Sequence, residues 1–121
     1  MANEITVTVK LVATKGFLNY RDEPGVQSIT MAGTTGCGGI QTIATSHEAV
    51  AIGDTGTAGW AFFRNTDATN YVELGRDNAG TFIGFAKLKA GEACVLRLGT
   101  NAPYARANTA SVNLQYYILA D

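Results

Sequence analysis

The stretch Trp60-Ala-Phe-Phe-Arg-Asn-Thr-Asp67 begins a series of four short apolar runs separated by turn-forming residues. The next three runs lie in Asn70-Tyr-Val-Glu-Leu-Gly75, Phe82-Ile-Gly-Phe-Ala-Lys-Leu-Lys-Ala-Gly-Glu92 and Cys94-Val-Leu-Arg-Leu98. Each gap carries glycine, asparagine, aspartate or threonine, which is typical of consecutive antiparallel strands joined by turns. Because most of the large side chains fall here, we expect the core to form around this stretch.

Strict alternation of side chains extends the pattern to both ends of the chain. One face of the N-terminal segment carries Ile5, Val7, Val9 and Leu11, and residues 112–119 alternate in the same way. Helical spacing persists nowhere for ten residues. The sequence therefore predicts an all-β fold, a single-domain antiparallel β-sandwich or jelly roll over residues 1–121 with little or no helix.

The first half of the chain is predicted to contain short strands and glycine-rich connections. Strands are expected at 4–12, 17–21, 26–31, 40–44 and 48–52. Pro24-Gly25 predicts a tight turn, because proline fixes φ and glycine supplies the positive φ of a type II turn. Gly33–Gly39 is expected to be a flexible loop. Residues 1–12 either close a sheet or act as an arm that reaches a neighbouring subunit.

Composition favours contact with other proteins over nucleic acid or membrane. Charged residues make up 16 % of the 121 residues, below the roughly 25 % of a typical soluble domain, and weakly charged surfaces suit packing between subunits. A net charge of −1 with dispersed basic residues predicts no nucleic-acid partner. No apolar run approaches the roughly 20 residues of a spanning helix, and no signal peptide is recognised. Cys37 and Cys94 are expected to be reduced thiols.

No catalytic, cofactor or metal site is predicted. Gly33–Gly39 lacks the lysine and hydroxyl residue of a P-loop, and the single Asp54-Thr-Gly copy cannot supply an aspartic dyad. His47 is the only histidine and is interpreted as a turn residue without clustered metal ligands. The carboxylates that could serve glycoside hydrolysis give no specific signal, as any small domain offers such pairs; they are Asp54, Asp67, Glu73 and Asp77.

The second half of the chain resembles small virion proteins of tailed bacteriophages, which are encoded among head and tail genes. The features that carry the resemblance are Asn65-Thr-Asp-Ala-Thr-Asn-Tyr-Val-Glu-Leu-Gly75, Lys87-Leu-Lys-Ala-Gly-Glu92, Val95-Leu-Arg-Leu98 and Leu114-Gln-Tyr-Tyr-Ile-Leu119. They cover residues 60–121, and their order and spacing carry more weight than any one motif. Residues 1–59 show no such match.

The resemblance implies a non-enzymatic structural virion component with a β-sandwich fold. A head decoration or cement protein is the first interpretation and a tail component the second. Its partner would be the major capsid protein or another virion protein, and it would form a homo-oligomer, typically a trimer. The resemblance also implies synthesis and assembly in the host cytoplasm, followed by location in the virion.

Interface candidates follow from residue type and position. Ile5, Val7 and Val9 lie on the N-terminal strand, which together with the glycine loop is the expected shell contact. Arg64, Tyr71 and Tyr104 are expected at a subunit interface, where aromatic and arginine side chains are enriched. The sequence leaves a different class open, a jelly-roll carbohydrate-binding module whose aromatic platform would be built from Trp60, Tyr20, Tyr71 and Tyr104.

Overall fold

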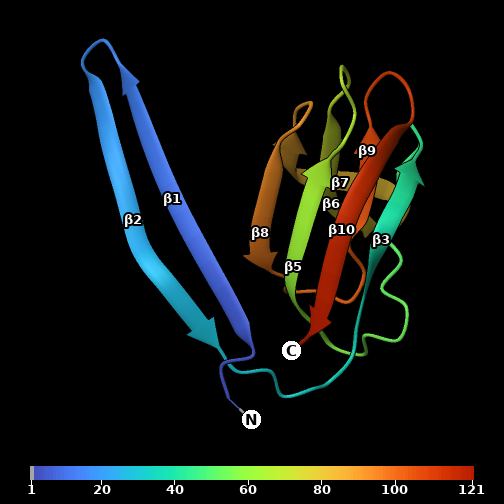
Figure 1. Ribbon diagram of the computed structural model, residues 1–121. Coiled ribbons are helices and arrows are strands. Elements are labelled where there is room, and N and C mark those ends of the chain that lie inside the picture. The colour runs from blue at the N-terminus through green and yellow to red at the C-terminus, as the bar shows by residue number, and fades with distance from the viewer. Residues whose placement is uncertain (1) are drawn as a thin grey trace. The chain divides into compact units, whose positions relative to one another are not determined.

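The computed structural model describes residues 2–121, which form ten β-strands and no helix. The strands are β1 Ile5–Lys15, β2 Leu18–Ile29, β3 Gly36–Ile43, β4 Glu48–Ala49, β5 Ala58–Asn65, β6 Val72–Asn78, β7 Thr81–Leu88, β8 Ala93–Arg97, β9 Tyr104–Ala107 and β10 Val112–Ala120 (Figure 1). All pairings are antiparallel. The predicted all-β sandwich is confirmed. Within the described residues no helix is long and apolar enough to cross a membrane.

The chain divides into two compact units, Met1–Ala32 and Gly33–Asp121. In the first unit β1 pairs with β2 alone, so these strands form a two-stranded hairpin. Gly16 adopts a φ of 58° in the turn between them, a conformation that glycine reaches at no steric cost. The N-terminal strand expected at residues 4–12 is therefore the first half of a longer hairpin.

The tight turn predicted at Pro24-Gly25 is wrong, because β2 runs through both residues. The pairing register shifts here: Val9 lies opposite Gly25, whereas Leu11 lies opposite Asp22. This is a β-bulge, one of the few places where a strand accommodates proline. Gly25 has a φ of 87°, so its positive φ serves the bulge and not a chain reversal.

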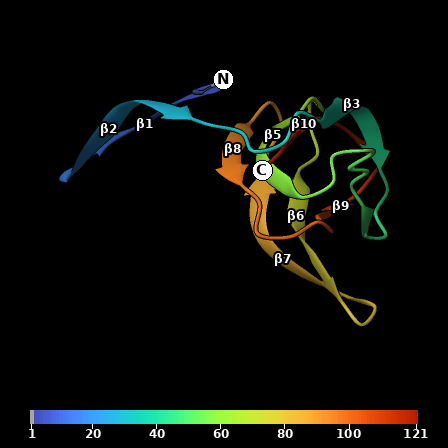
Figure 2. The same cartoon turned by 90° about the horizontal axis from the view of Figure 1, so that it is seen from below.

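The second unit is a jelly roll made of two four-stranded sheets (Figures 1 and 2). The β10 sheet has the order β3-β10-β5-β8, and the β6 sheet has the order β4-β9-β6-β7. Successive strands cross between the sheets except at the β6–β7 hairpin, which is the strand order of two Greek keys. The tip of the β6–β7 hairpin extends beyond the rest of the sandwich in Figure 2.

The core lies between these two sheets and follows from the alternation of side chains. In β10 every second residue from Val112 to Ile118 is buried, and the intervening residues are partly or fully exposed. Phe63, Leu114 and Ile118 are among the largest fully buried side chains. Inward residues of both sheets interdigitate, as expected for a sandwich with one solvated face per sheet.

The flexible loop predicted at Gly33–Gly39 is wrong over its second half, because Gly36–Gly39 belongs to β3. Gly38 lies opposite Tyr117 of β10. A Cβ atom at Gly38 would collide with the Tyr117 ring and would lie 2.8 Å from the carbonyl oxygen of Tyr116. Glycine is therefore required here by a close approach of strand and ring rather than by flexibility.

The gap between the runs that begin at Trp60 and Asn70, whose turn-forming residues predict a connection, is the β5–β6 connection and is organised by buried Asn65. Its Nδ2 donates to the carbonyl oxygens of Asn70 at 2.8 Å and Leu88 at 3.0 Å. Its Oδ1 accepts from the amide of Asp67 at 2.8 Å. Asp67 Oδ2 accepts from the amide of Asn70 at 2.6 Å, and these bonds hold the β5–β6 connection against the end of β7.

Candidate functional site

The outer surface of the β10 sheet carries an exposed apolar face. Val95, Phe62 and Tyr117 form one row across β8, β5 and β10, because they are direct partners in register. The Phe62 and Tyr117 rings have centroids 6.1 Å apart. We name this surface the aromatic face and define it by five residues: Ile40, Trp60, Phe62, Val95 and Tyr117. Ile40 is 67 % exposed and Tyr117 48 % exposed.

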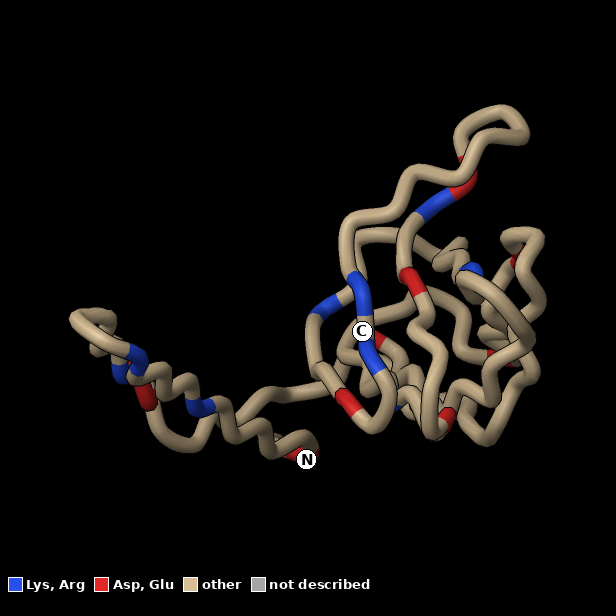
Figure 3. Tube along the Cα trace, turned by 90° about the horizontal axis from the view of Figure 1, so that it is seen from above, with Lys and Arg blue, Asp and Glu red and all other residues tan. Residues whose placement is uncertain are grey.

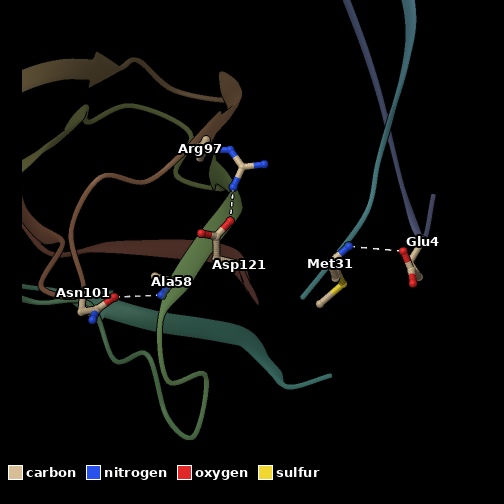
Figure 4. Close-up of polar contacts among 6 residues, drawn as sticks. All are labelled: Glu4, Met31, Ala58, Arg97, Asn101 and Asp121. Carbon is tan, nitrogen blue, oxygen red and sulfur yellow. Dashed lines mark hydrogen bonds and ion pairs between the residues drawn. The ribbon is translucent and has the colours of Figure 1, made fainter. Parts of the chain in front are cut away.

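Cationic side chains border the aromatic face. Arg64 follows Phe62 on the outer side of β5 and is exposed. The Arg97 guanidinium lies 5.6 Å from the centroid of the Trp60 ring and forms an ion pair with Asp121 (Figure 4). Elsewhere in the described chain, charges of both signs are interspersed along the trace (Figure 3). The face therefore combines aromatic, aliphatic and arginine side chains, as the centres of protein interfaces do.

A separate apolar cleft opens where both sheets end, between β7 and β8. Its volume is about 420 Å³, within the range of ligand-sized pockets. Phe63, Leu74, Leu96 and Leu98 line its interior, and Ile83, Phe85 and Arg76 lie around it. We name it the β7–β8 cleft.

A β-bulge shapes this cleft. Leu74 pairs with Ala86 and Gly75 pairs with Gly84, which leaves Phe85 as an extra residue on β7. A Cβ atom at Gly75 would lie 2.7 Å from the Gly84 Cα, so only glycine permits this approach. Bulges reorient side chains at sheet edges, and Phe85 is 66 % exposed as a result.

A third feature, on the β6 sheet, is a histidine–carboxylate pair flanked by aromatic rings. His47 Nε2 lies 2.8 Å from Asp77 Oδ1, and its ring centroid lies 5.7 Å from those of both Phe82 and Tyr104. This hydrogen bond is the largest cause of the lowered pKa of Asp77. The pair attaches the β3–β4 connection, which contains His47, to the end of β6.

Three of the four carboxylates considered for glycoside hydrolysis, Asp67, Glu73 and Asp77, have separate structural partners. Glu73 Oε1 accepts from Arg106 Nη2 at 3.0 Å, and Asp77 is bound to His47. Backbone amides of Asn70 and Thr69 lower the pKa of Asp67. A general acid needs a raised pKa. The pKa values of Asp67 and Asp77 are instead lowered.

The structure separates the predicted interface residues into three groups. Ile5 and Val7 are buried, whereas Val9 on the same face of β1 is 41 % exposed. Arg64 borders the aromatic face. Tyr71 and Tyr104 belong to the region of the β6 sheet, where the Lys87 ammonium lies 4.4 Å from the Tyr71 ring centroid and Tyr104 contacts His47.

The aromatic residues considered for sugar binding come from both units of the chain. Trp60 lies on the outer side of the β10 sheet, whereas Tyr104 is a β9 residue of the β6 sheet. Tyr20 belongs to the hairpin unit. The residues chosen for this role are therefore distributed over different elements.

The described residues contain two thiols and no cluster of metal-binding side chains. No group of three or more histidine, cysteine, aspartate or glutamate side chains could hold a metal ion in residues 2–121. Cys37 and Cys94 are free thiols. Cys37 Sγ accepts from the Thr55 hydroxyl at 3.3 Å, and burial raises the pKa of Cys94.

Sequence reasoning missed most of the aromatic face. The alternation of Trp60-Ala-Phe-Phe-Arg64 predicts one strand face for Trp60, Phe62 and Arg64, and the structure confirms it. Sequence reasoning did not identify Ile40, Val95 and Tyr117 as their neighbours, because these residues come from three strands distant in sequence. The available signal was the period of two in residues 112–119. It places Tyr117 on the strand face that does not carry Val112, Leu114, Tyr116 and Ile118.

Comparison of the chain with protein-family models, with curated protein sequences and with solved structures finds no match.

Proposed function

We propose that this chain is a non-enzymatic structural protein of a phage virion, a decoration or cement protein that binds the assembled head shell. The proposal combines the resemblance of residues 60–121 to small phage virion proteins with the composition of the aromatic face. The partner is the major capsid protein or another virion protein. Synthesis and assembly take place in the host cytoplasm, and the protein then remains in the virion.

The aromatic face is the observation that carries the proposal. Antiparallel sheets usually present polar residues on the side away from the core. Here Val95, Phe62 and Tyr117 form a continuous apolar row, and Ile40 extends the surface onto β3 with 67 % of its area exposed. Apolar patches of this kind mark protein contact sites, and aromatic residues with arginine dominate binding energy at such sites.

The structure of the face suits a rigid, pre-assembled partner. Gly38 allows the Tyr117 ring to lie against β3, and Tyr117 is fixed further by its contact with Phe62. Side chains that are already ordered lose little entropy on binding. A shell also repeats the same surface many times, so a homo-oligomer, expected to be a trimer, would gain affinity from simultaneous contacts.

Sedimentation with purified particles tests the proposal. The probe is a preparation of undecorated heads from the phage in which the gene for this chain is deleted. We expect the purified chain to sediment with these heads to a saturating, regular stoichiometry. Sedimentation with isolated tails but not with heads would replace the head assignment by the tail assignment, and binding to neither particle would overturn the proposal.

A further inference from the structure

The N-terminal hairpin presents an apolar surface that two strands cannot bury by themselves. Val9 and Leu11 of β1 share a face with Leu18 and Tyr20 of β2, given the pairing register and the alternation of side chains. Exposed fractions on this apolar hairpin face range from 41 % at Val9 to 64 % at Leu11 and Tyr20. Phe17 in the turn is fully exposed. An isolated two-stranded hairpin is marginally stable in water.

The opposite hairpin face is mainly polar. Thr6 lies opposite Ser28 and Thr14 opposite Asn19, and all four side chains are exposed. Val12 and Val26 are the exposed apolar residues of this polar face, whereas the Leu11 face holds more apolar area and one lysine, Lys15, opposite Leu18.

The β7–β8 cleft is a second uncovered apolar surface on the same chain. β7 is the terminal strand of the β6 sheet, so one edge of it has no strand partner. Ile83 is 41 % exposed and Phe85 66 % exposed beside the cleft. Exposed apolar edge strands are usually covered, because they otherwise pair with other chains.

We propose that the apolar hairpin face of one copy docks on the β7–β8 cleft of the next copy, so that copies join head to tail in a closed ring. Each copy then contributes one hairpin and one cleft. Such a heterologous contact forms rings when its rotation closes. The contact uses none of the five residues of the aromatic face, and it gives a structural basis for the homo-oligomer of the proposed function, on which it rests in that one respect.

The exposed hairpin surface has the size that a stable contact needs. The apolar hairpin face and the turn together offer on the order of 500 Å² of exposed apolar area, from Val9, Leu11, Phe17, Leu18 and Tyr20. This sum takes roughly 60–120 Å² of exposed area for each aliphatic side chain and more for each aromatic one. A standard interface buries about 800 Å² per partner, of which somewhat more than half is apolar. The hairpin therefore matches one side of such an interface.

Charge complementarity supports the same pairing. Asp22 lies directly opposite Leu11 and so shares the apolar hairpin face, whereas Arg76 lies at the β7–β8 cleft. Within residues 2–121 neither side chain forms an ion pair. Docking would place an unpaired carboxylate and an unpaired guanidinium on facing surfaces, and such pairs fix the register of a contact.

Light scattering on the full chain with two complementary variants tests the proposal. We expect the wild type to be a closed oligomer, and both Leu11→Glu and Phe85→Glu to be folded monomers by circular dichroism. Leu11→Glu keeps an intact cleft, and Phe85→Glu keeps an intact hairpin. Their mixture should therefore form a one-to-one dimer that grows no further, because its two remaining surfaces are both defective. Thr8→Glu, on the polar hairpin face, should leave the oligomer unchanged.

A monomeric wild type throughout a concentration series would overturn the proposal, as would an oligomer that survives Leu11→Glu. Failure of the two variants to form a dimer when mixed would overturn it as well. Charge reversal provides a test that does not alter apolar packing. Asp22→Arg and Arg76→Asp should each weaken assembly several-fold, and the double variant should restore it; a double variant no better than the single ones would contradict this docking register.

The outcomes separate this inference from the proposed function. A chain that forms rings but does not sediment with heads retains the ring and refutes the shell contact. A chain that binds heads as a monomer retains the shell contact and refutes both the ring and the homo-oligomer.

Discussion

The ring of Tyr117 lies against Gly38, its direct partner on the neighbouring strand of the β10 sheet. The ring occupies the space that a side chain at position 38 would fill. The contact also explains why a run of glycines can belong to a strand, because the ring covers backbone that glycine leaves exposed. The aromatic face depends on this arrangement.

Gly38→Ala is therefore expected to destabilise the sandwich. The added Cβ would meet the Tyr117 ring and lie 2.8 Å from the backbone oxygen of Tyr116, which cannot move freely. We expect a loss of about 2 kcal/mol in the free energy of unfolding, measured by urea denaturation. Gly99→Ala is the control, because a Cβ there has no neighbour within 4 Å; equal effects of the two substitutions would contradict the assignment.

Asn65→Ala should cost more, since Asn65 is fully buried and all its hydrogen bonds are internal. The substitution removes the amide donor that Asn65 supplies to the carbonyl oxygens of Asn70 and Leu88. Unsatisfied buried groups cost about 1–3 kcal/mol each, so we expect a loss of about 3 kcal/mol by urea denaturation. Asn113→Ala is the matched control on an exposed amide and should stay within about 0.5 kcal/mol of wild type.

Acid should destabilise the fold partly through Asp77. The His47 hydrogen bond holds the pKa of its carboxyl below the ordinary value of 3.8. Because the pKa of Asp77 is lower in the folded state, the unfolded chain binds a proton at this carboxylate first as pH falls. The contribution of Asp77 to the free energy of unfolding is therefore complete above the pKa of the unfolded state and is lost as pH falls through the pKa of the folded state. We expect the urea midpoint of Asp77→Asn to decline less steeply than that of wild type below about pH 5. Parallel declines would contradict the His47–Asp77 contact.

Cys94 should react slowly with alkylating reagents. Burial raises the pKa of its thiol above the ordinary 9.0, which lowers the fraction of reactive thiolate at mildly alkaline pH. In a Cys37→Ser background, we expect iodoacetamide to modify folded Cys94 more slowly than the same residue in urea, as followed by mass spectrometry. Equal rates would show that the β8 position of Cys94 is not protected.

Local patterns were sufficient to predict much of the fold. Alternation in residues 112–119 and at Trp60 to Arg64 divided the side chains correctly between two strand faces, because side-chain direction in a strand depends only on the parity of position. The expectation that the Trp60–Arg64 strand is covered on both sides is wrong, since Arg64 is exposed. The turn chemistry of Asp67 was also predictable, since its carboxylate bonds amides two and three residues ahead. The strand β9 was not predicted, as its four residues are too few to show a period.

The candidate surfaces depend on contacts that sequence spacing does not contain. Tyr117 and Gly38 are brought together by the pairing of β10 with β3, and His47 meets Asp77 across 30 residues. Pro24-Gly25 illustrates a different difficulty, because a bulge and a turn demand the same residue types. Only the continued pairing on both sides distinguishes the two.

The most direct test of the shell contact is head sedimentation with a single charge placed in the aromatic face. Tyr117→Glu should fold, retain the oligomeric mass of wild type and lose sedimentation with undecorated heads, because a carboxylate would be desolvated against the shell. Thr81→Glu, an exposed β7 residue of the other sheet, adds the same charge and should bind heads as wild type does. Wild-type head binding by folded Tyr117→Glu would contradict the account.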